Sequence, residues 1–244
     1  MKLNEETKQK ETDFLFYAPD IKSTNQLPEQ ESRHCVKVLR MSEGDKIVVT
    51  DGKGYLYYCT IIQAHHKHTA LSIDKEVQQP KTWNFELQLA FAPTKNMDRN
   101  EWFVEKATEI GIDRISPIKC SFSERKEVRL DRLEKVAISA MKQSKQAVAP
   151  SIDEMVSFDD FIIQPFEGQK FIAHCYNDIK NPLTSIYKKN QNALILIGPE
   201  GDFSEEEVQK ALENGFTPIS LGDNRLRTET ACLVACHTIH VLNQ

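Results

Sequence analysis

Residues 193–216, with the sequence ALILIGPEGDFSEEEVQKALENGF, constrain the fold more than any other segment of the chain. The first five residues are all apolar, which is expected of a strand that is covered on both faces. Ser204 and Glu207 have the spacing of a capping box, which predicts the start of a helix, and Gly215 predicts its end. A buried strand that runs through a short glycine-containing turn into a helix is typical of α/β proteins with a parallel sheet.

The same alternation of strand and helix extends over most of the chain after residue 80. Apolar patterns predict further strands in FELQLAFAP, RISPIKC, KFIAHC and TPISLG. Amphipathic patterns predict helices over residues 98–111, 131–144 and 231–244, and we expect at most one short helix, in SFDDFII, between residues 150 and 169. We therefore predict that residues 80–244 form one α/β domain with a mostly parallel sheet flanked by helices.

Residues 14–79 have a different pattern, with short runs of β-branched and aromatic residues. The runs KIVVT and YLYYCTII flank Asp51-Gly52-Lys53-Gly54, which predicts a hairpin with a connection of about four residues. We predict a small β-barrel or β-sandwich here, followed by a linker at QQPKTWN. The highly charged residues 1–13 are predicted to be a disordered leader.

The composition excludes several classes of protein. The 244 residues are 40% apolar and 27% charged with a net charge of −5, as in an ordinary soluble globular protein. No segment approaches the roughly 18 consecutive apolar residues of a membrane-spanning helix, and the start lacks the apolar region of a signal peptide. The six cysteines form no CxxC pair, so we expect reduced thiols in a cytoplasmic protein. His65, His66 and His68 have no carboxylate partners nearby in sequence, and we predict no metal site.

Charge is unevenly distributed along the chain. Residues 119–145 contain eight basic and four acidic side chains, a local excess of +4. This stretch is consistent either with a solvated helix face carrying pairs such as Asp131–Lys135 or with a surface that contacts phosphates.

Two polar loops follow predicted strands and are candidates for a ligand site. Gly198-Pro199-Glu200-Gly201 follows the apolar strand, and DNRLRTET follows TPISLG. In parallel sheets both loops lie beyond the carboxyl ends of strands, where ligands bind. Each is also explained by a plain strand-to-helix turn, but the second loop carries more hydrogen-bonding side chains than such a turn requires. The dinucleotide, Walker and nucleophile-elbow motifs are absent, and the acidic first loop suits a ligand with positive charge.

Three motifs in this order, KATEIG (106–111), IGPEGDFSEEE (197–207) and LGDNRLRTETA (221–231), resemble those of the knotted SPOUT-class RNA methyltransferases. Within that class, the chain resembles the 16S ribosomal RNA (uracil-N3) methyltransferase family. The segment RHCVKVLRMSEGDKIVVTDGKG (33–54) is similar to the PUA-like RNA-binding domain of that family. The resemblance covers essentially every residue after 13. It implies S-adenosylmethionine as methyl donor, a trefoil knot in the sheet, and a homodimer with its active site near the subunit interface.

The resemblance also implies roles for individual residues. Cofactor-binding residues carried over are Thr94, Ile197, Gly198, Pro199, Glu200, Gly201, Leu221, Gly222, Leu226, Arg227, Thr228, Thr230 and Ala231. Charge, rather than the resemblance alone, suggests an RNA-binding face, for which the candidate residues are Arg33, His34, Lys37, Arg40, Lys95, Arg125, Lys142 and Lys145.

The chain departs from the family pattern at several of these places. Asp202 stands where the family usually has glycine, and Arg225 stands where it has an apolar residue. Lys142-Gln143-Ser144-Lys145-Gln146 replaces a run that resembles Glu-Gln-Ser-Gly-Arg. Asp202 either narrows the pocket or caps the following helix.

The implied reaction removes a proton from uracil N3, a poor nucleophile, and transfers a methyl group to it. This chemistry requires a base or cations that stabilise the uracil anion. Glu200 and Glu229 are the candidate bases, and Arg125 and Arg227 are the candidate anion stabilisers. Because N3 lies on the Watson–Crick edge, the target uridine should be unpaired. Two alternatives stay open: a methyltransferase of this class that acts on another RNA or base, and a non-catalytic RNA-binding protein that assists ribosome assembly.

Overall fold

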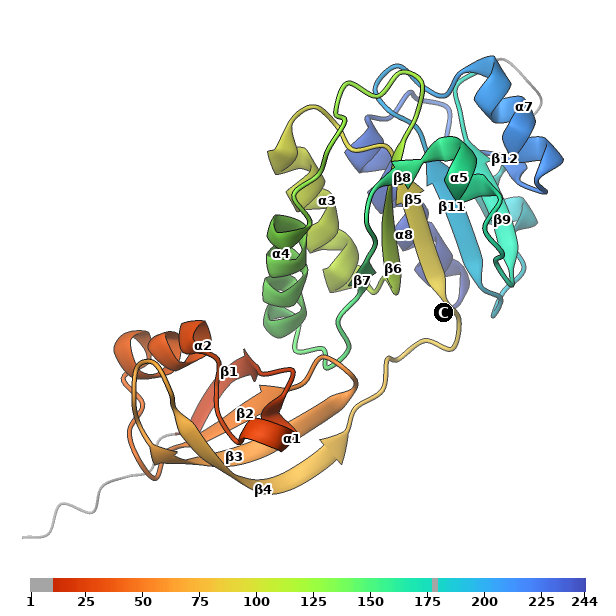
Figure 1. Cartoon of the computed structure of the whole chain (residues 1–244). Coiled ribbons are helices and arrows are strands. Elements are labelled where there is room, and N and C mark those ends of the chain that lie inside the picture. Colours follow the sequence, from red (N-terminus) through yellow and green to blue (C-terminus); the bar gives the residue numbers. More distant parts are fainter. Residues whose placement is uncertain (1–10, 177–179) are drawn as a thin grey trace, which may run out of the picture. The chain divides into compact units, whose positions relative to one another are not determined.

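A computed structural model describes residues 11–176 and 180–244 (Figure 1). These residues form two compact units, one made of residues 11–82 and Met141–Ala149 and the other of Trp83–Ala140 and the described part of residues 150–244. Of the predicted leader, residues 1–10 lie outside the described residues, and the first strand begins at Glu11. The return of Met141–Ala149 to the first unit was not predicted from the sequence.

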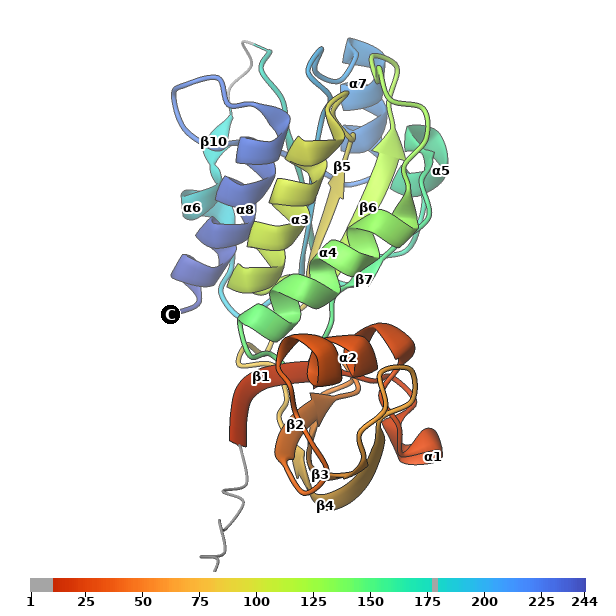
Figure 2. The same ribbon diagram turned by 90° about the vertical axis from the view of Figure 1, so that its left-hand side faces the viewer.

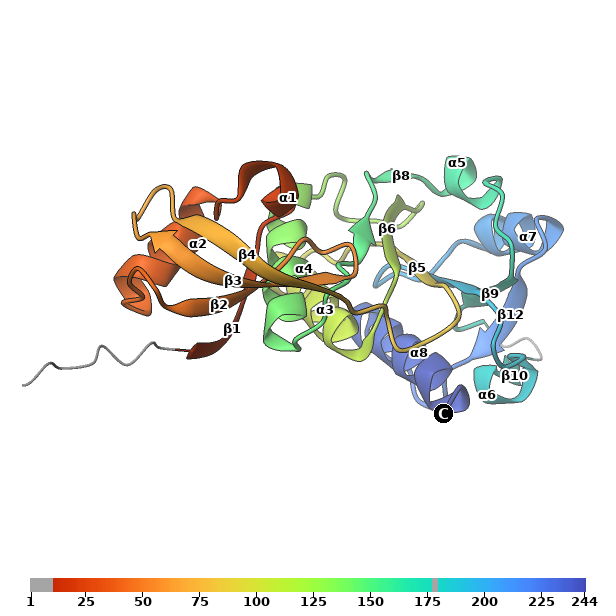
Figure 3. The ribbon, with the colours of Figure 1, turned by 90° about the horizontal axis from the view of Figure 1, so that it is seen from below.

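The first unit is built on a four-stranded sheet (Figure 3). Its strands, in spatial order, are β1 (Glu11–Tyr17), β2 (Lys46–Thr50), β3 (Tyr55–Gln63) and β4 (Ala70–Gln78). β1 pairs in parallel with β2, and the other two pairings are antiparallel. Between β1 and β2 lie α1 (Ile21–Thr24), α2 (Glu29–Arg33) and a π-helical turn, η1 (His34–Val38). The predicted four-residue connection between β2 and β3 is confirmed.

The segment Met141–Ala149 is joined to this sheet by backbone hydrogen bonds. The amide of Gly54 donates to the carbonyl of Ala147 at 2.8 Å, and the amide of Ala149 donates to the carbonyl of Gly52 at 2.9 Å. Gly52 has φ of +75°, and a Cβ there would lie 2.9 Å from the ring of Tyr17, so both the backbone conformation and the space favour glycine.

The second unit contains a parallel sheet with the order β10-β12-β9-β11-β5-β6-β7, and β8 also pairs with β6. Its strands are β5 (Leu87–Phe91), β6 (Arg114–Lys119), β7 (Ser151–Ile152), β8 (Val156–Ser157), β9 (Gln169–Ala173), β10 (Asn181–Pro182), β11 (Ala193–Ile197) and β12 (Thr217–Ser220). Its helices are α3 (Met97–Ile110), α4 (Leu130–Gln143, whose last three residues belong to the first unit), α5 (Phe158–Ile162), α6 (Leu183–Ile186), α7 (Glu205–Glu213) and α8 (Thr228–Leu242). The predicted α/β architecture with a parallel sheet is confirmed.

Helices cover both faces of this sheet, as Figure 2 shows. α3, α8 and the first half of α4 pack with Leu87, Leu89 and Phe91, whereas α5 and α7 pack on the opposite face with Ala90. Side chains of successive strand residues point to opposite faces, and β11 is therefore apolar on both sides, with Ala193, Ile195 and Ile197 in one core cluster and Leu194 and Leu196 in the other. This arrangement is the reason why the central strands read as continuous apolar runs in the sequence.

The helix boundaries follow from capping residues that the sequence carries. The capping box of Ser204 and Glu207 at the start of α7 is confirmed. α3 ends at Gly111, as predicted, with φ of +119°. On α3, Phe103 and Ala107 are buried, whereas Trp102 is exposed.

An ion pair in the first unit yields a stability prediction. Lys142 Nζ binds Glu31 Oε1, and Glu31 is buried. Replacing Lys142 by methionine leaves this carboxylate without its cation, and we expect a loss of about 2 kcal/mol in the free energy of unfolding, measured by urea denaturation.

Lys135 provides a matched control on the same helix. It is exposed and lies 3.9 Å from Asp131, so its replacement by methionine should change the stability by less than about 0.5 kcal/mol. The double variant Glu31→Gln/Lys142→Met should recover most of the loss. Equal effects of Lys142→Met and Lys135→Met would contradict this account.

Candidate functional site

A pocket of about 560 Å³ opens at the carboxyl ends of three adjacent parallel strands, β9, β11 and β12. Its size is in the range of small-molecule and cofactor sites. The loop after each strand contributes to the lining. The lining residues are Ala173, His174, Cys175, Lys180, Ile197, Gly198, Pro199, Glu200, Asp202, Ile219, Ser220, Leu221, Gly222, Asp223, Asn224, Arg225, Leu226, Arg227, Thr228 and Ala231.

The two predicted cofactor loops meet at this pocket. β11 ends at Ile197, and the hydroxyl of Thr228, the first residue of α8, donates to the carbonyl of Gly198 at 3.0 Å. This hydrogen bond is buried and joins the loop after β11 to the loop after β12. Gly222 has φ of +131°, a backbone conformation that favours glycine. The space at its Cβ position is open, so the backbone conformation and not a steric contact favours glycine here.

The third wall of the pocket comes from the loop after β9, which the sequence analysis did not identify. The Oδ2 atom of Asp202 accepts a hydrogen bond from the amide of Cys175 at 2.7 Å, and its Oδ1 atom accepts one from the amide of Phe203 at 2.8 Å. Asp202 therefore ties the loop after β9 to the loop after β11, with φ of +69° at a position where glycine meets no steric cost. The side chain of Lys180 donates to the carbonyl of His174, the residue that follows β9, at 2.7 Å.

Most of the predicted cofactor residues line the pocket. Those that do are Ile197, Gly198, Pro199, Glu200, Leu221, Gly222, Leu226, Arg227, Thr228 and Ala231. Three predicted residues do not line it, Thr94, Gly201 and Thr230. Thr94 is buried, and its hydroxyl donates to the carbonyl of Asn96. Gly201 instead lies against Phe122.

The four predicted catalytic residues separate into two groups. Glu200 and Arg227 line the pocket, whereas Arg125 and Glu229 do not. Glu229 is buried with its Oε1 atom 3.7 Å from Arg99 of α3.

Arg125 and Glu200 both hold the chain after β5. The guanidinium of Arg125 donates to the carbonyl of Thr94 at 2.9 Å and also to that of Lys95. The amide of Lys95 in turn donates to Glu200 Oε1 at 3.1 Å. These contacts hold the Glu200 carboxylate at the pocket. They also link Arg125 to Glu200 through the backbone of Thr94 and Lys95.

Charged groups set the protonation of two side chains near the pocket. The pKa of Lys95 is raised above its ordinary value, chiefly by its hydrogen bond with Glu124, so Lys95 is a cation at neutral pH. Burial raises the pKa of the Cys175 thiol, and the carboxylate of Asp202 raises it further. Cys175 is therefore a neutral thiol at neutral pH and is poorly suited to act as a nucleophile.

The predicted RNA contacts of the first unit gather around η1. Arg33, Lys37 and Arg40 are exposed, and the ring of His34 lies 5.8 Å from that of Phe14 and 6.1 Å from that of Phe16. Lys142 is held by Glu31 and is not presented to solvent as a free cation, whereas Lys145 is exposed.

The described residues, 11–176 and 180–244, contain neither a membrane-spanning helix nor a group of side chains placed to hold a metal ion. In this part of the chain, no helix has the length and apolar character to cross a membrane. Within the same residues, no group of three or more His, Cys, Asp or Glu side chains is placed to hold a metal ion.

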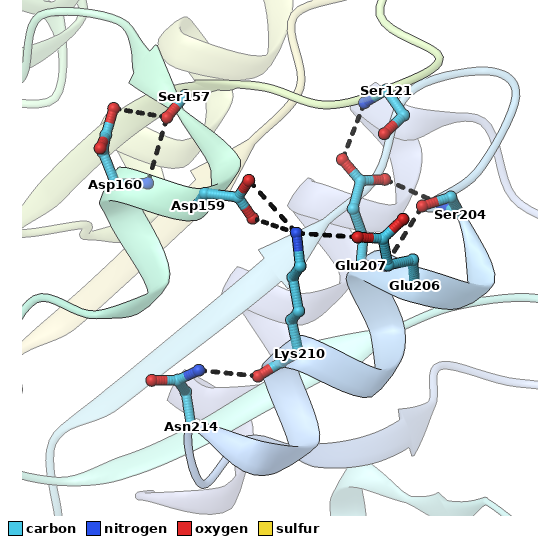
Figure 4. Close-up of polar contacts among 9 residues, drawn as sticks. All are labelled: Ser121, Ser157, Asp159, Asp160, Ser204, Glu206, Glu207, Lys210 and Asn214. Carbon is cyan, nitrogen blue, oxygen red and sulfur yellow. Dashed lines mark hydrogen bonds and ion pairs between the residues drawn. The ribbon is translucent and has the colours of Figure 1, made fainter.

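The loop after β6 is fastened to the start of α7 by Glu207 (Figure 4). Glu207 is buried, its Oε1 atom accepts from the amide of Ser121 at 2.7 Å, and its Oε2 atom accepts from the amide of Ser204 at 2.8 Å. One carboxylate thus serves as a helix cap and as the anchor of a neighbouring loop.

Removing this carboxylate should be costly. Glu207→Ala leaves two backbone amides without acceptors, and we expect a loss of about 2–4 kcal/mol in the free energy of unfolding by urea denaturation. Glu206→Ala is the matched control, because Glu206 is exposed and pairs only at the surface with Lys210, and it should cost less than about 0.5 kcal/mol. Similar losses in the two variants would refute the anchoring role.

Comparisons with known proteins agree with this architecture. Residues 81–240 match the RNA methyltransferase domain family, and residues 27–74 match the RNA methyltransferase PUA domain. The chain is 30% identical over 221 residues to ribosomal RNA small subunit methyltransferase E of Buchnera aphidicola subsp. Acyrthosiphon pisum, covering 87% of this chain and 86% of the relative. It is 26% identical over 223 residues to the protein of the same name from Bacillus subtilis, covering 86% and 87%.

Solved structures give the same result. A probable rRNA-methyltransferase from Porphyromonas gingivalis has a TM-score of 0.90 and 43% identity, covering 94% of this chain and 98% of that one. A ribosomal RNA small subunit methyltransferase E from Neisseria gonorrhoeae, bound to S-adenosyl methionine, has a TM-score of 0.84 and 26% identity with the same coverage. This likeness spans both units of the chain, and the protein therefore belongs to the RNA methyltransferase family that includes the ribosomal RNA small subunit methyltransferases E.

Proposed function

We propose that this protein transfers a methyl group from S-adenosylmethionine to N3 of one uridine in 16S ribosomal RNA of the small subunit. The observation that carries the proposal is the pocket formed by the loops after β9, β11 and β12. The Neisseria gonorrhoeae relative, which is bound to S-adenosyl methionine, supports the identity of the donor.

The chemistry of the pocket fits that donor. The apolar side chains of Ile197, Leu221 and Leu226 offer a surface for a flat adenine ring, and the polar loops offer hydrogen-bonding groups for the sugar and amino acid parts. The carboxylates that line the pocket, those of Glu200, Asp202 and Asp223, suit a sulfonium cation. When bound, S-adenosylmethionine supplies an electrophilic methyl group.

The residues of this chain supply the proton chemistry. In the proposed reaction Glu200 accepts the N3 proton of uracil, because its carboxylate is at the pocket and is held by the amide of Lys95. Arg227, which also lines the pocket, stabilises the negative charge left on the base. Arg125 positions the segment that carries Lys95, through its hydrogen bonds to two carbonyl oxygens. Glu229 faces Arg99 and is left out of this scheme.

The RNA is held partly by the first unit. The exposed cations of Arg33, Lys37 and Arg40 suit contacts with phosphates, which makes binding sensitive to salt. Because N3 is hidden in a base pair, the target uridine is unpaired or flipped out before it reacts. The match of residues 27–74 to the PUA domain of RNA methyltransferases supports this role.

We further propose that the second unit contains a trefoil knot and that the protein acts as a homodimer in the cytoplasm, where its ribosomal substrate is made. The placement of β11 between β5 and β9, with the chain continuing to α8, is compatible with such a knot. α3 and α8 leave Trp102 and Val241 exposed, and large apolar side chains of this kind suit a subunit interface.

The hydrogen bond between the two cofactor loops gives a test of the donor site. Thr228→Val removes the hydroxyl that donates to Gly198, and we expect binding of S-adenosylmethionine to weaken about tenfold in isothermal titration calorimetry. Thr230→Val is the matched control, because Thr230 lies in the same helical turn but outside the pocket. If both variants bind the donor equally, the pocket is not the donor site.

The product of the reaction tests the function itself. Unmodified 16S ribosomal RNA, or small-subunit particles, incubated with the protein and donor should yield 3-methyluridine in mass spectrometry of nucleosides. Glu200→Gln keeps an acceptor for the Lys95 amide but is a far weaker base, so kcat should fall about 100-fold with unchanged donor affinity. Glu229→Gln should keep kcat within about threefold.

The outcome separates the proposal from its alternatives. A methylated nucleoside other than 3-methyluridine, or methylation of another RNA, indicates a related methyltransferase with a different substrate. Binding of RNA without binding of the donor indicates a non-catalytic assembly protein.

A further inference from the structure

Phe122 is a large apolar side chain that stands exposed beside the candidate pocket. It lies in the loop between β6 and α4, and 52% of its surface is accessible. Several other large apolar side chains are exposed in the described residues, and Phe122 differs from Ile163, for example, in lying against the loop that carries Glu200. Neither the pocket nor the proposed proton chemistry uses it.

The position of the ring is set by Gly201. A Cβ atom at Gly201 would lie 3.0 Å from Cβ of Phe122 and 3.6 and 3.9 Å from its ring atoms Cγ and Cδ2. The Cβ end of the Phe122 side chain therefore packs against the backbone of the loop that carries Glu200. The absence of a side chain at residue 201 permits this close approach.

Hydrogen bonds on both sides of Phe122 hold its loop in place. The amide of Ser121 donates to the buried carboxylate of Glu207 at 2.7 Å. The hydroxyl of Ser123 accepts from the amide of Cys120 at 2.9 Å, and the amide of Ser123 donates back to the carbonyl of Cys120 at 3.1 Å. A ring on a loop that is fixed in this way loses little conformational entropy when a partner stacks on it.

The surroundings of Phe122 indicate what that partner is. The guanidinium of Arg125 donates hydrogen bonds to the backbone carbonyls of Thr94 and Lys95. Lys119 and Lys126 are exposed and close to Phe122 in sequence, and the same stretch carries the exposed carboxylates of Glu127 and of Glu124, which pairs with Lys95 at 2.9 Å. An accessible aromatic face among cations is the combination by which proteins bind unpaired nucleotides, with the base stacked on the ring and the phosphates near the cations.

We propose that Phe122 is the stacking platform for the unpaired base that accepts the methyl group, and that it positions this base beside Glu200. The inference rests on the proposed function, since it takes the substrate to be a base in RNA. It assigns to the loop after β6 a role in binding the acceptor that is separate from the role of the three loops that form the pocket.

Three variants test this role. Phe122→Leu keeps an apolar side chain but has no aromatic face, and it should raise KM for the RNA about tenfold or more. Phe122→Tyr keeps the face and should stay within about twofold of the unmodified protein. Ile163→Ala removes another exposed apolar side chain, one on the chain after α5, and should change nothing. The affinity for S-adenosylmethionine, measured by calorimetry, should be the same in all of them.

A binding measurement keeps the test independent of catalysis. Phe122→Trp should show quenching of its fluorescence when unmodified 16S ribosomal RNA is added, beyond the change seen in the unmodified protein with Trp83 and Trp102 alone. Quenching with a methylated product other than 3-methyluridine would keep the stacking role and overturn the assigned base.

Other outcomes overturn the proposal. If Phe122→Leu retains the KM of the unmodified protein, or if Leu and Tyr lose activity equally, the ring is not a stacking platform. If Phe122→Leu instead changes the elution volume in size-exclusion chromatography, the side chain belongs to an interface between protein molecules.

Discussion

The order of three parallel strands, β12-β9-β11, is the constraint on which the candidate site depends. Because the carboxyl ends of parallel strands lie at one edge of a sheet, three segments distant in sequence deliver their loops to a single place. Two hydrogen bonds then join these loops, one from Thr228 to Gly198 and one from Cys175 to Asp202. Each bond crosses between loops of different strands, so the pocket is a property of the sheet rather than of any one motif.

Local signals in the sequence predicted much of this arrangement. The capping box at Ser204, the glycine at the end of α3 and the apolar run of β11 each depend on neighbours within a few residues, and each was interpreted correctly. The wall formed by His174 and Cys175 was missed, because its place depends on β9 lying between β11 and β12. Strand order is set by packing between distant segments, and no pattern within KFIAHC contains that information.

Helical geometry explains which residues of the second loop reach the pocket. Thr228 and Ala231 are three residues apart in the first turn of α8 and both line it, whereas Glu229 and Thr230 between them do not. Residues at this spacing share a helix face, and the residues between them point elsewhere. The roles proposed for Glu229 and Thr230 came from the resemblance of the whole motif LGDNRLRTETA, which does not show which residues face the pocket. Lys142 was similarly interpreted from its charge alone, without its partner Glu31.

The return of Met141–Ala149 to the first unit means that neither unit is a contiguous stretch of sequence. The chain passes from one unit to the other three times, after Thr82, after Ala140 and after Ala149. A fragment that stops at the linker near Pro80 would lack the acceptor that Ala147 offers to Gly54 and the cation that Lys142 offers to Glu31. The first unit therefore cannot be transferred to another protein as one continuous segment, and recombination or truncation at a single point would separate it from part of its own framework.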